Sequence, residues 1–301
     1  MTIRDSAGAT DTGHKRRRNE DSYVCEPPLF AVADGMGGHQ AGEVASRLAA
    51  AALREDVEPA GGTERIEELI REANRRIWQH SKEDVTASGM GTTVTAARVE
   101  GDSVTIGHVG DSRAYRIREG QIEQLTEDHS LAAELERSGK LSAEEARMHP
   151  QRSVITRALG TDPDVEIDAF SVEGRPGDVY LICSDGLSSM VDDATILAVV
   201  EGRRSNLETA ARELVRAANR SGGEDNITVV CFELGSEGDA EPAPADADAD
   251  ADEDTLDGSV SLVIPLEDLD PPKRASHAPA WLVALPLLLV VLGLLLWGLS
   301  R

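Results

Sequence analysis

The chain has 301 residues, of which 40% are hydrophobic, and its formal net charge at pH 7 is -25. That length allows one domain of catalytic size with additional segments, and so acidic a surface excludes nucleic acid as a partner, because nucleic-acid binding needs lysine and arginine to neutralise phosphates. The three cysteines, Cys25, Cys183 and Cys231, lie far apart without CxxC spacing, which argues against a disulfide framework or a zinc site and indicates a reducing compartment.

The first half of the chain predicts one strand, two helices and a run of further strands. The N-terminal residues are polar and lack an apolar leader, and "PLFAVAD" then predicts a strand. Amphipathic helices are predicted at residues 42–56 and 63–80. The β-branched stretch 91–126, interrupted by "EGD", "GDS" and "EGQ" turns, predicts an antiparallel meander.

The second half of the domain predicts a short helix, an irregular segment, two strands and two further helices. The short helix covers residues 130–138, and a polar segment continues to about residue 160. "DVYLICSDG" and "NITVVCFEL" are strand patterns, with helices predicted between them at 193–201 and 205–219. This order predicts sheets packed together with helices on the outside.

Residues 236–278 have the composition of a tether. Positions 236–270 hold 13 acidic and no basic residues, and self-repelling charge with proline and alanine predicts an extended, disordered linker. "ADADADADED" lacks the glycines and the spacing of a calcium loop. The apolar stretch 259–269 is either a strand-adding peptide for a partner or a spacer.

Residues 279–299 are predicted to form a transmembrane helix. The uncharged stretch 281–299 reaches roughly 28 Å as a helix, enough to cross the hydrocarbon core; a buried helix or an oligomerisation tail is the alternative. Lys273 and Arg274 precede it and Arg301 follows it, a bias that predicts an N-terminal domain in the cytoplasm. The chain is therefore predicted to be a single-pass, tail-anchored protein of the cell membrane.

Acidic residues stand at the ends of several predicted strands. Each Asp-Gly or Gly-Asp pair alone is a common turn, but strands of one sheet pair would bring these residues to one edge. Several carboxylates within a few ångströms require cations, and an all-oxygen cluster selects magnesium or manganese. The residues are Glu20 and Asp21 before the first predicted strand, Asp34, Asp111 and Asp185 at strand ends, and Asp225 before the last strand.

Seven stretches resemble, in order, the motifs of one enzyme family. They are "DTGHKRRRNEDS", "ADGMGGHQAGEVAS", "GMGTTVTAA", "GHVGDSRAY", "LTEDHS", "LICSDGL" and "GGEDNITVV". The pattern is similar to the bacterial branch of the type 2C metal-dependent serine/threonine protein phosphatases (the PPM family). The resemblance implies that residues 1–235 form an α+β, four-layer αββα sandwich of two antiparallel sheets flanked by helices, with a two-metal centre between the sheets.

The resemblance also implies which residues hold the metals. Asp34 would bridge two tightly bound Mn²⁺ or Mg²⁺ ions. Asp185 and Asp225 would complete the ligands of one ion, and the carbonyl of Gly35 would bind the other. Together the two cations would lower the pKa of a water that attacks phosphorus.

Four further residues receive roles from the matched motifs. Glu20 and Asp21 would act on the metals directly or through waters, and Asp111 with Asp185 would hold a third, weaker ion. Arg16, four residues before Glu20, would grip the substrate phosphate. The implied catalytic residues are therefore Arg16, Asp34 and Asp185.

Some positions depart from the family pattern. Met36 stands where many members have a histidine after Asp-Gly, and His39 follows three residues later, which leaves the proton donor open. Ser189 replaces an acidic residue that some relatives have four positions after Asp185, so the third ion is in question. Arg17 and Arg18 are interpreted as solvated neighbours.

Three other features complete the comparison with the family. Gly37 and Gly38 would leave room for ions, waters and substrate. Thr92 and Thr93 are interpreted as strand-packing residues. The segment 128–160 matches a flap beside the active site, which affects the choice of substrate.

The sequence therefore predicts a membrane-tethered phosphatase that removes phosphate from serine and threonine of proteins, opposing Ser/Thr kinases and acting on their substrates. Aspartyl-phosphate phosphatases need a DxDx[TV] strand end, which is absent. A pseudophosphatase that binds phosphoproteins or acts as a scaffold remains the alternative, although it would be expected to lose metal ligands that are acidic here.

Overall fold

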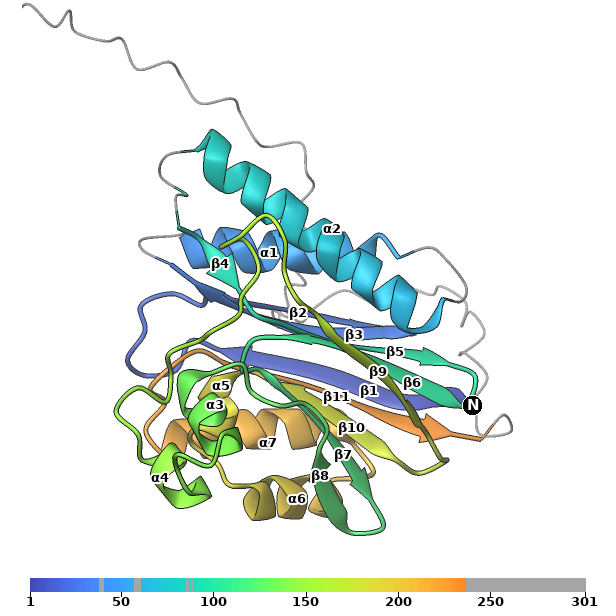
Figure 1. Cartoon of the computed structure of the whole chain (residues 1–301). Helices are drawn as coiled ribbons and strands as arrows, with labels where there is room; N and C mark the ends of the chain where they lie inside the picture. The colour runs from blue at the N-terminus through green and yellow to red at the C-terminus, as the bar shows by residue number, and fades with distance from the viewer. Residues whose placement is uncertain (38–40, 57–60, 85–86, 88, 237–301) are drawn as a thin grey trace, which may run out of the picture. The chain divides into compact units, whose positions relative to one another are not determined.

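The computed structural model describes residues 1–37, 41–56, 61–84, 87 and 89–236. In this part of the chain, two antiparallel sheets are stacked face to face and helices cover their outer faces (Figure 1). The predicted α+β sandwich is thereby confirmed. The predicted linker and membrane helix lie outside the described residues, and none of the described helices combines the length and apolarity needed to cross a bilayer.

One sheet has the order β2-β3-β5-β6-β9, with β4 paired to β3. The strands are β2 (Asp21–Glu26), β3 (Leu29–Met36), β4 (Gly91–Thr92), β5 (Val94–Glu100), β6 (Ser103–Val109) and β9 (Asp168–Glu173). Helices α1 (Ala41–Arg54) and α2 (Gly62–Glu83) cover it. α1 packs through a stripe of small residues at helical spacing, Ala41, Ala45, Ala49 and Ala52, which lets it approach β3 closely.

The other sheet has the order β1-β11-β10-β7-β8. Its strands are β1 (Thr2–Asp11), β7 (Arg113–Arg118), β8 (Gln121–Gln124), β10 (Val179–Cys183) and β11 (Ile227–Gly235). Three helices belong to this side, α5 (Asp185–Ser188), α6 (Asp193–Gly202) and α7 (Leu207–Arg220). α7 buries Leu207, Ala211, Leu214 and Ala218, the one-sided pattern expected of a helix lying on a sheet.

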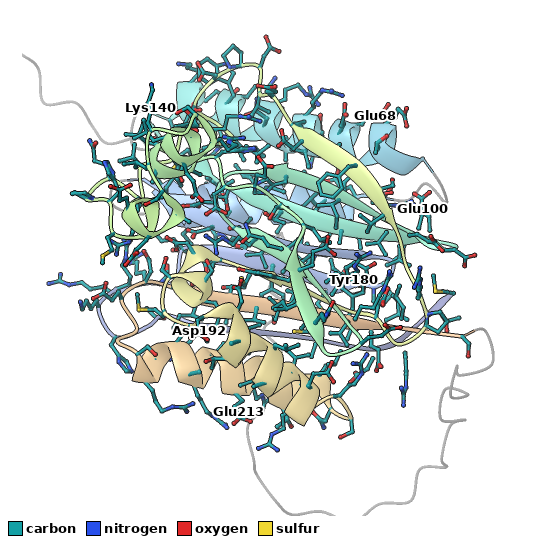
Figure 2. The ribbon with its side chains drawn as sticks, turned by 60° about the horizontal axis from the view of Figure 1, so that its bottom comes forward. Glu68, Glu100, Lys140, Tyr180, Asp192 and Glu213 are labelled. Atoms are coloured by element: carbon teal, nitrogen blue, oxygen red, sulfur yellow. The ribbon has the colours of Figure 1, made fainter. Side chains whose placement is uncertain are left out.

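Aromatic rings join the two sheets in the middle of the sandwich. Phe30 of β3 stacks on Phe232 of β11 with ring centroids 4.1 Å apart. Tyr180 of β10, labelled in Figure 2, stacks on Phe232 at 5.1 Å. Such pairs add about 0.5–1.5 kcal/mol each beyond the apolar area they bury, and these buried rings form the core between the sheets.

The predicted meander is divided between the two sheets. β5 and β6 form a hairpin in one sheet, whereas β7 and β8 form a hairpin in the other. The chain crosses at Gly110, which has φ 117°, and a Cβ there would meet Thr93 at 2.5 Å. Only glycine fits such a backbone and such a close approach, and Asp111 follows it directly.

Five of the described elements were not among those predicted: β1, β2, β9, α4 and α5. β1 precedes β2, so Glu20 and Asp21 lie at the second strand and the expectation that they precede the first is wrong. β9 follows the flap, which is the segment 128–160. Inside the flap, α3 (Leu131–Arg137) matches the predicted helix, and α4 (Ala143–Arg147) is additional, with a capping box between Ser142 and Glu145.

Candidate metal centre

Asp34 lies at the end of β3 with its backbone fixed on both sides. The Thr93 amide and the Thr92 hydroxyl donate to the Asp34 carbonyl at 2.9 and 2.8 Å, and the Asp34 amide donates to Thr93 Oγ1 at 3.1 Å. Both threonines are fully buried. They pack in the strands as predicted, and they also set the position of the Asp34 backbone.

Asp21 lies directly opposite Asp34 in the β2–β3 ladder. Residues that face each other in an antiparallel pair have Cβ atoms about 4.5–5.5 Å apart. The register alone therefore brings two carboxylates together at this end of the sheet, although they are thirteen positions apart in the chain.

Asp21 also connects this sheet to the other one. Its Oδ2 accepts hydrogen bonds from Ser184 Oγ at 2.9 Å and from Thr228 Oγ1 at 2.6 Å. Ser184 follows β10 and is the residue before Asp185, and Thr228 lies near the start of β11. The ends of three strands from two sheets thus meet at one carboxylate, and Asp185 is placed beside it.

The pKa values record the mutual proximity of these acidic groups. Burial raises the pKa of Asp34 well above its usual range, and the charges of Asp21, Asp185, Asp111 and Asp225 raise it further. The pKa of Asp21 is raised to about 7, mainly by burial, against the effect of its two hydroxyl partners. Like charges at this separation favour protonation unless a cation is supplied.

Asp111 and Asp185 show the same behaviour. Burial raises the pKa of Asp111 to about 8, with the charges of Asp185 and Asp128 acting in the same direction. Burial and the charge of Asp225 raise the pKa of Asp185 to about 6, although a hydrogen bond with Asp34 opposes them. Asp185 begins α5 and Asp111 begins the crossing to β7, so elements of both sheets contribute.

Three buried oxygens of the cluster have no protein partner. They are Asp21 Oδ1, Asp111 Oδ1 and Asp185 Oδ1. Unpartnered buried acceptors are rare in proteins, and carboxylate oxygens are the ligands that magnesium and manganese prefer. The residues therefore fit hard divalent ions, even though no three His, Cys, Asp or Glu side chains in the described ranges are already spaced around one point.

Glu20 and Gly35 converge on a second spot beside the start of α1. A Cβ added to Gly42 would lie 2.7 Å from Glu20 Oε2 and 2.8 Å from the carbonyl oxygen of Gly35. A Cβ on Gly35 would meet the Gly42 carbonyl at 2.2 Å. Both glycines are therefore required for the close approach, and the two predicted ligand oxygens lie near each other.

Arg16 reaches the cluster through Asp225. Its Nη2 donates to Asp225 Oδ2 at 2.6 Å, and that bond is the largest of the effects that raise the pKa of Arg16, to which the charges of Asp34 and Glu20 also contribute. The Arg16 side chain is half exposed. It can therefore present N–H donors to an anion arriving from solvent.

Asn226 is a supporting residue that the sequence did not single out. Its Oδ1 accepts from the Glu20 amide at 2.8 Å, and its Nδ2 donates to the carbonyls of Thr12 and Arg18 at 2.9 Å. It thereby ties the loop that carries Arg16 to the start of β11. Ser184 and Thr228 were missed as well; their position beside Asp185 and Asp225 in the motifs is the signal that could have suggested them.

Several predicted positions stay outside the cluster. Met36 ends β3 opposite Gly91, and it has no proton to transfer. Ser189 caps α5, and its amide donates to the Asp185 carbonyl at 2.8 Å. His39 and Gly38 lie outside the described residues.

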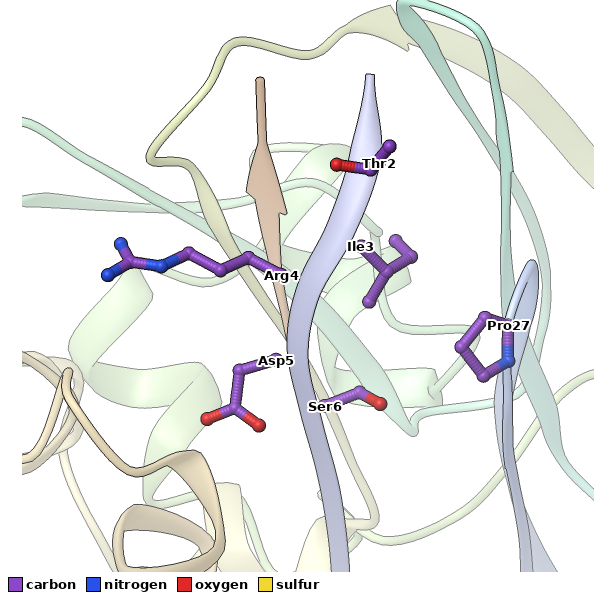
Figure 3. A pocket seen from close by; sticks show the side chains of 6 residues that line it. All are labelled: Thr2, Ile3, Arg4, Asp5, Ser6 and Pro27. Carbon is purple, nitrogen blue, oxygen red and sulfur yellow. The ribbon is translucent and has the colours of Figure 1, made fainter. Parts of the chain in front are cut away.

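A surface hollow elsewhere in the domain offers no comparable set of ligands. It lies beside β1 and is lined by Thr2–Ser6 and Pro27 (Figure 3). Its one carboxylate, Asp5, already accepts a hydrogen bond from the Leu207 amide at 3.0 Å. The hollow is therefore not a second candidate centre.

Comparison with known proteins gives concordant matches. The sequence profile described as Protein phosphatase 2C matches residues 9–227. The serine/threonine phosphatase stp of Listeria innocua is 40% identical over 236 residues, which cover 74% of this chain and 93% of that protein. The serine/threonine protein phosphatase PstP of Mycobacterium tuberculosis is 42% identical over 231 residues, 76% of this chain and 44% of that protein.

Solved structures agree with the sequence comparison. The crystal structure of the Mycobacterium tuberculosis phosphatase PstP/Ppp has a TM-score of 0.74 and 42% identity, covering 77% of this chain and 99% of that one. A PstP catalytic domain in complex with two manganese ions has a TM-score of 0.72 and 39% identity, covering 77% and 98%.

Proposed function

The chain belongs to the protein phosphatase 2C family and is a metal-dependent serine/threonine protein phosphatase; on that premise we propose that it hydrolyses phosphoserine and phosphothreonine at the aspartate cluster described above. The observation that carries this assignment to the site is the set of buried, unpartnered oxygens of Asp21, Asp111 and Asp185. Buried acceptors of this kind are costly without a partner, and divalent cations are the partner that suits them.

The proposed ligands are distributed over both sheets. Asp34, Asp185 and Asp225, with the carbonyl of Gly35, would hold two ions. Glu20 and Asp21 would contribute directly or through water. When bound, the cations supply the acidity that makes water a nucleophile near neutral pH and offset charge on the phosphoryl oxygens.

A third, weaker ion is part of the proposal. Asp111 would hold it together with Asp185, which supplies one of the charges that raise the pKa of Asp111. Ser189 contributes no acidic ligand there. Occupancy is therefore expected only at higher metal concentration than the two main sites require.

The chain's own residues orient the reaction. Ser184 and Thr228 fix one oxygen of Asp21, and its other oxygen has no protein partner and is available to a metal. Asn226 holds the loop bearing Arg16. Arg16 can exchange its exposed contact with Asp225 for the phosphoryl oxygens of a substrate, a charge-assisted interaction that orients the phosphate for attack.

The membrane attachment and the partners belong to the same proposal. An uncharged stretch at 281–299 supports a transmembrane anchor, and the acidic segment before it supports an extended tether. Such a tether would raise the effective concentration of the phosphatase near Ser/Thr kinases at the cytoplasmic face of the membrane and near their substrates.

The test of the catalytic assignment uses the full chain. With Mn²⁺, it should hydrolyse p-nitrophenyl phosphate and a phosphothreonine peptide, and chelation of the metal should abolish both activities. Asp34→Asn and Asp185→Asn should be inactive, whereas Asp193→Asn, at the exposed start of α6, should match the wild type. Absence of turnover with any divalent ion would favour a phosphoprotein-binding scaffold instead.

The anchor is tested separately by cell fractionation. The full chain should sediment with membranes, and a variant lacking residues 237–301 should be recovered in the soluble fraction. If both variants distribute alike, the proposed anchor is wrong, and the catalytic assignment is unaffected.

A further inference from the structure

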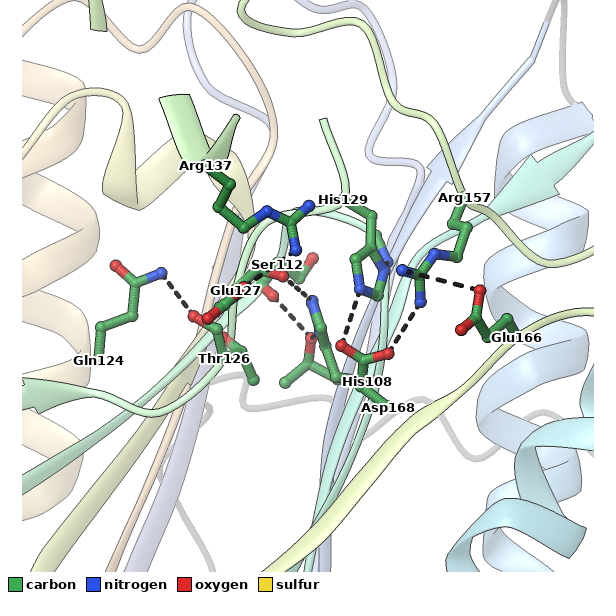
Figure 4. Close-up of polar contacts among 12 residues, drawn as sticks. His108, Ser112, Gln124, Thr126, Glu127, His129, Arg137, Arg157, Glu166 and Asp168 are labelled. Atoms are coloured by element: carbon green, nitrogen blue, oxygen red, sulfur yellow. Dashed lines mark hydrogen bonds and ion pairs between the residues drawn. The ribbon is translucent and has the colours of Figure 1, made fainter. Parts of the chain in front are cut away.

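The two ends of the flap meet at a single carboxylate, that of Asp168. Its Oδ2 accepts a hydrogen bond from Nε2 of His129, at the start of the flap, with 3.1 Å between the two atoms. Its Oδ1 accepts from Arg157 Nη1, near the end of the flap, at 2.8 Å. Figure 4 shows both side chains directed at Asp168, each towards a different oxygen of its carboxylate. We call these three residues the clasp.

The protonation of His129 follows from its other contact. The Gly110 amide donates to His129 Nδ1 at 3.1 Å, so Nδ1 must be unprotonated and Nε2 carries the hydrogen given to Asp168. Burial lowers the pKa of His129, which agrees with a neutral ring. The His129 amide in turn donates to the Gly110 carbonyl at 2.7 Å.

The main chain of the flap ends is paired at the clasp. The Thr156 amide donates to the His129 carbonyl at 2.8 Å, and the Leu131 amide donates to the Val154 carbonyl at 2.9 Å. Asp168 itself is fixed in β9, opposite His108 of β6. One residue of the sheet therefore holds both flap ends, and through them the helices α3 and α4.

The flap borders the aspartate cluster on two sides. Its first end is bonded to Gly110, next to Asp111, and the charge of Asp128 helps to raise the pKa of Asp111. At the other side, the positive charge of Arg152 contributes to the lowered pKa of Glu224, the residue before Asp225. We therefore expect a protein substrate whose phosphate enters the cluster to contact the flap at the end that is bonded to Gly110.

We propose that the clasp of His129, Arg157 and Asp168 positions the flap for phosphoprotein binding. This inference rests on the proposed phosphatase function. A small phosphomonoester needs only the metal centre and Arg16. A peptide must also contact the flap, and a flap that is loose before binding adds an ordering cost to association.

The experiment compares two substrates on the full chain with Mn²⁺, a phosphothreonine peptide and p-nitrophenyl phosphate. The variants are Asp168→Asn and Arg157→Gln, which break the ion pair, and Arg157→Lys, which keeps one charged donor. The control is Glu213→Gln on α7 (Figure 2), which removes an ion pair with Arg203 of the same 2.8 Å length. The Glu213 carboxylate is about as exposed as that of Asp168, at 32% and 38%.

Breaking the clasp should affect the peptide much more than the small substrate. For Asp168→Asn and Arg157→Gln, we expect KM for the peptide to rise about tenfold relative to any change for p-nitrophenyl phosphate. Arg157→Lys and Glu213→Gln should stay within about twofold of the wild type. The double variant should equal Asp168→Asn, because that change already removes the carboxylate that both His129 and Arg157 contact.

Equal losses for the two substrates would make the clasp merely structural and overturn the proposal, as would no loss for either. Hydrogen exchange at the Leu131 and Thr156 amides gives an independent readout. Faster exchange in Asp168→Asn supports the clasp, and unchanged exchange contradicts it. If the wild type hydrolyses neither substrate, the proposed function fails, while exchange still decides whether the clasp holds the flap.

Discussion

The two ends of β3 both bury aspartates, but they handle the charge in opposite ways. At one end, Asp34 lies among other carboxylates, and burial and repulsion raise its pKa. At the other end, Arg98, opposite Leu29 in the ladder, binds Asp56 at 2.6 Å. Burial raises the pKa of Asp56, but hydrogen bonds from Arg98 and Arg65 outweigh it, so that pKa is lowered.

The two ends of β3 differ in whether the buried charge is neutralised by the protein itself or by a bound metal. The Arg98 and Asp56 side chains are only 1% and 4% exposed, and Glu100 and Arg65 complete the network. Here the chain supplies its own cations, and the cluster is neutralised on folding. At the aspartate end, Arg16 lies at the rim and pairs with Asp225. Arg113 acts on Asp111 but is already paired with Asp128, so the remaining neutralising charge is expected from bound metal.

The largest effect, a loss of kcat, should come from removing a carboxylate of the aspartate cluster around Asp34. Asp34→Asn is expected to lower kcat for p-nitrophenyl phosphate on the order of a hundredfold or more, because each 1.36 kcal/mol of lost stabilisation costs a factor of ten. Steady-state rates over a range of Mn²⁺ concentrations measure it. Full activity at high Mn²⁺ would show that Asp34 only tunes metal affinity.

At the end of β3 where Arg98 binds Asp56, a substitution should change the stability of the protein and not its catalysis. Asp56→Asn removes the carboxylate that the buried Arg98 shares with Arg65, and it is expected to lower the free energy of unfolding by about 3–5 kcal/mol. Urea unfolding measures the loss, with Glu213→Gln as a surface control expected within about 1 kcal/mol. An Asp56→Asn protein as stable as the wild type would remove the contrast between the two ends.

His108 is a buried titratable group of a third kind, a neutral base. Its Nε2 donates to the Glu127 carbonyl at 3.0 Å, and its Nδ1 lies 2.9 Å from Thr95 Oγ1. Burial lowers the pKa of His108 to about 4, and protonation of His129 beside it would act in the same direction. The hydrogen bond to the Glu127 carbonyl and the charges of Asp128 and Asp168 oppose this shift.

This depressed pKa predicts acid sensitivity. Since the folded value is below the unfolded value of 6.5, the unfolded chain binds the proton first. The stabilisation is fully present above pH 6.5 and lost as pH falls towards 4, by about 3 kcal/mol. Between pH 7 and 4, the free energy of unfolding measured in chelator should fall by about 3 kcal/mol less for His108→Gln than for the wild type. Parallel losses would contradict a neutral His108.

The smallest expected effect is that of Asp34→Asn on the free energy of unfolding in the absence of metal. Without metal, the raised pKa of Asp34 favours its protonated, neutral form, which asparagine matches in shape and charge. The unfolding free energy in chelator should change by less than about 1 kcal/mol. A loss as large as that of Asp56→Asn would mean that Asp34 is held charged by the protein itself.

The elements missed by sequence reasoning are those with weak patterns. β1, β2 and β9 are edge strands with mostly half-buried residues, so none of them has the alternation of apolar and polar residues that reveals a strand. α5 has only four residues. α4 has five residues, too few for helical periodicity. The capping pair Ser142 and Glu145 was the available signal.

The site divides in the same way. The acidic residues could be found because they stand at strand ends within recognisable motifs, and the structure brings Asp21, Asp34, Asp111 and Asp185 together. Sequence reasoning could not find the hydroxyls of Ser184 and Thr228 or the amide of Asn226, because serine, threonine and asparagine occur throughout the chain. Their role depends on a distance between two sheets, which no local pattern records.

The pairing of β1 with β11 has a consequence for engineering. Thr2 lies opposite Gly235 in that ladder, and Thr2 Oγ1 donates to the Ser236 carbonyl at 3.2 Å. The start of the domain and its exit point are therefore neighbours, and in Figure 1 they lie at the opposite side from α5, which Asp185 begins. A short peptide could join them in a circular permutant, with new termini opened in an exposed turn such as that between β7 and β8, without disturbing the metal ligands.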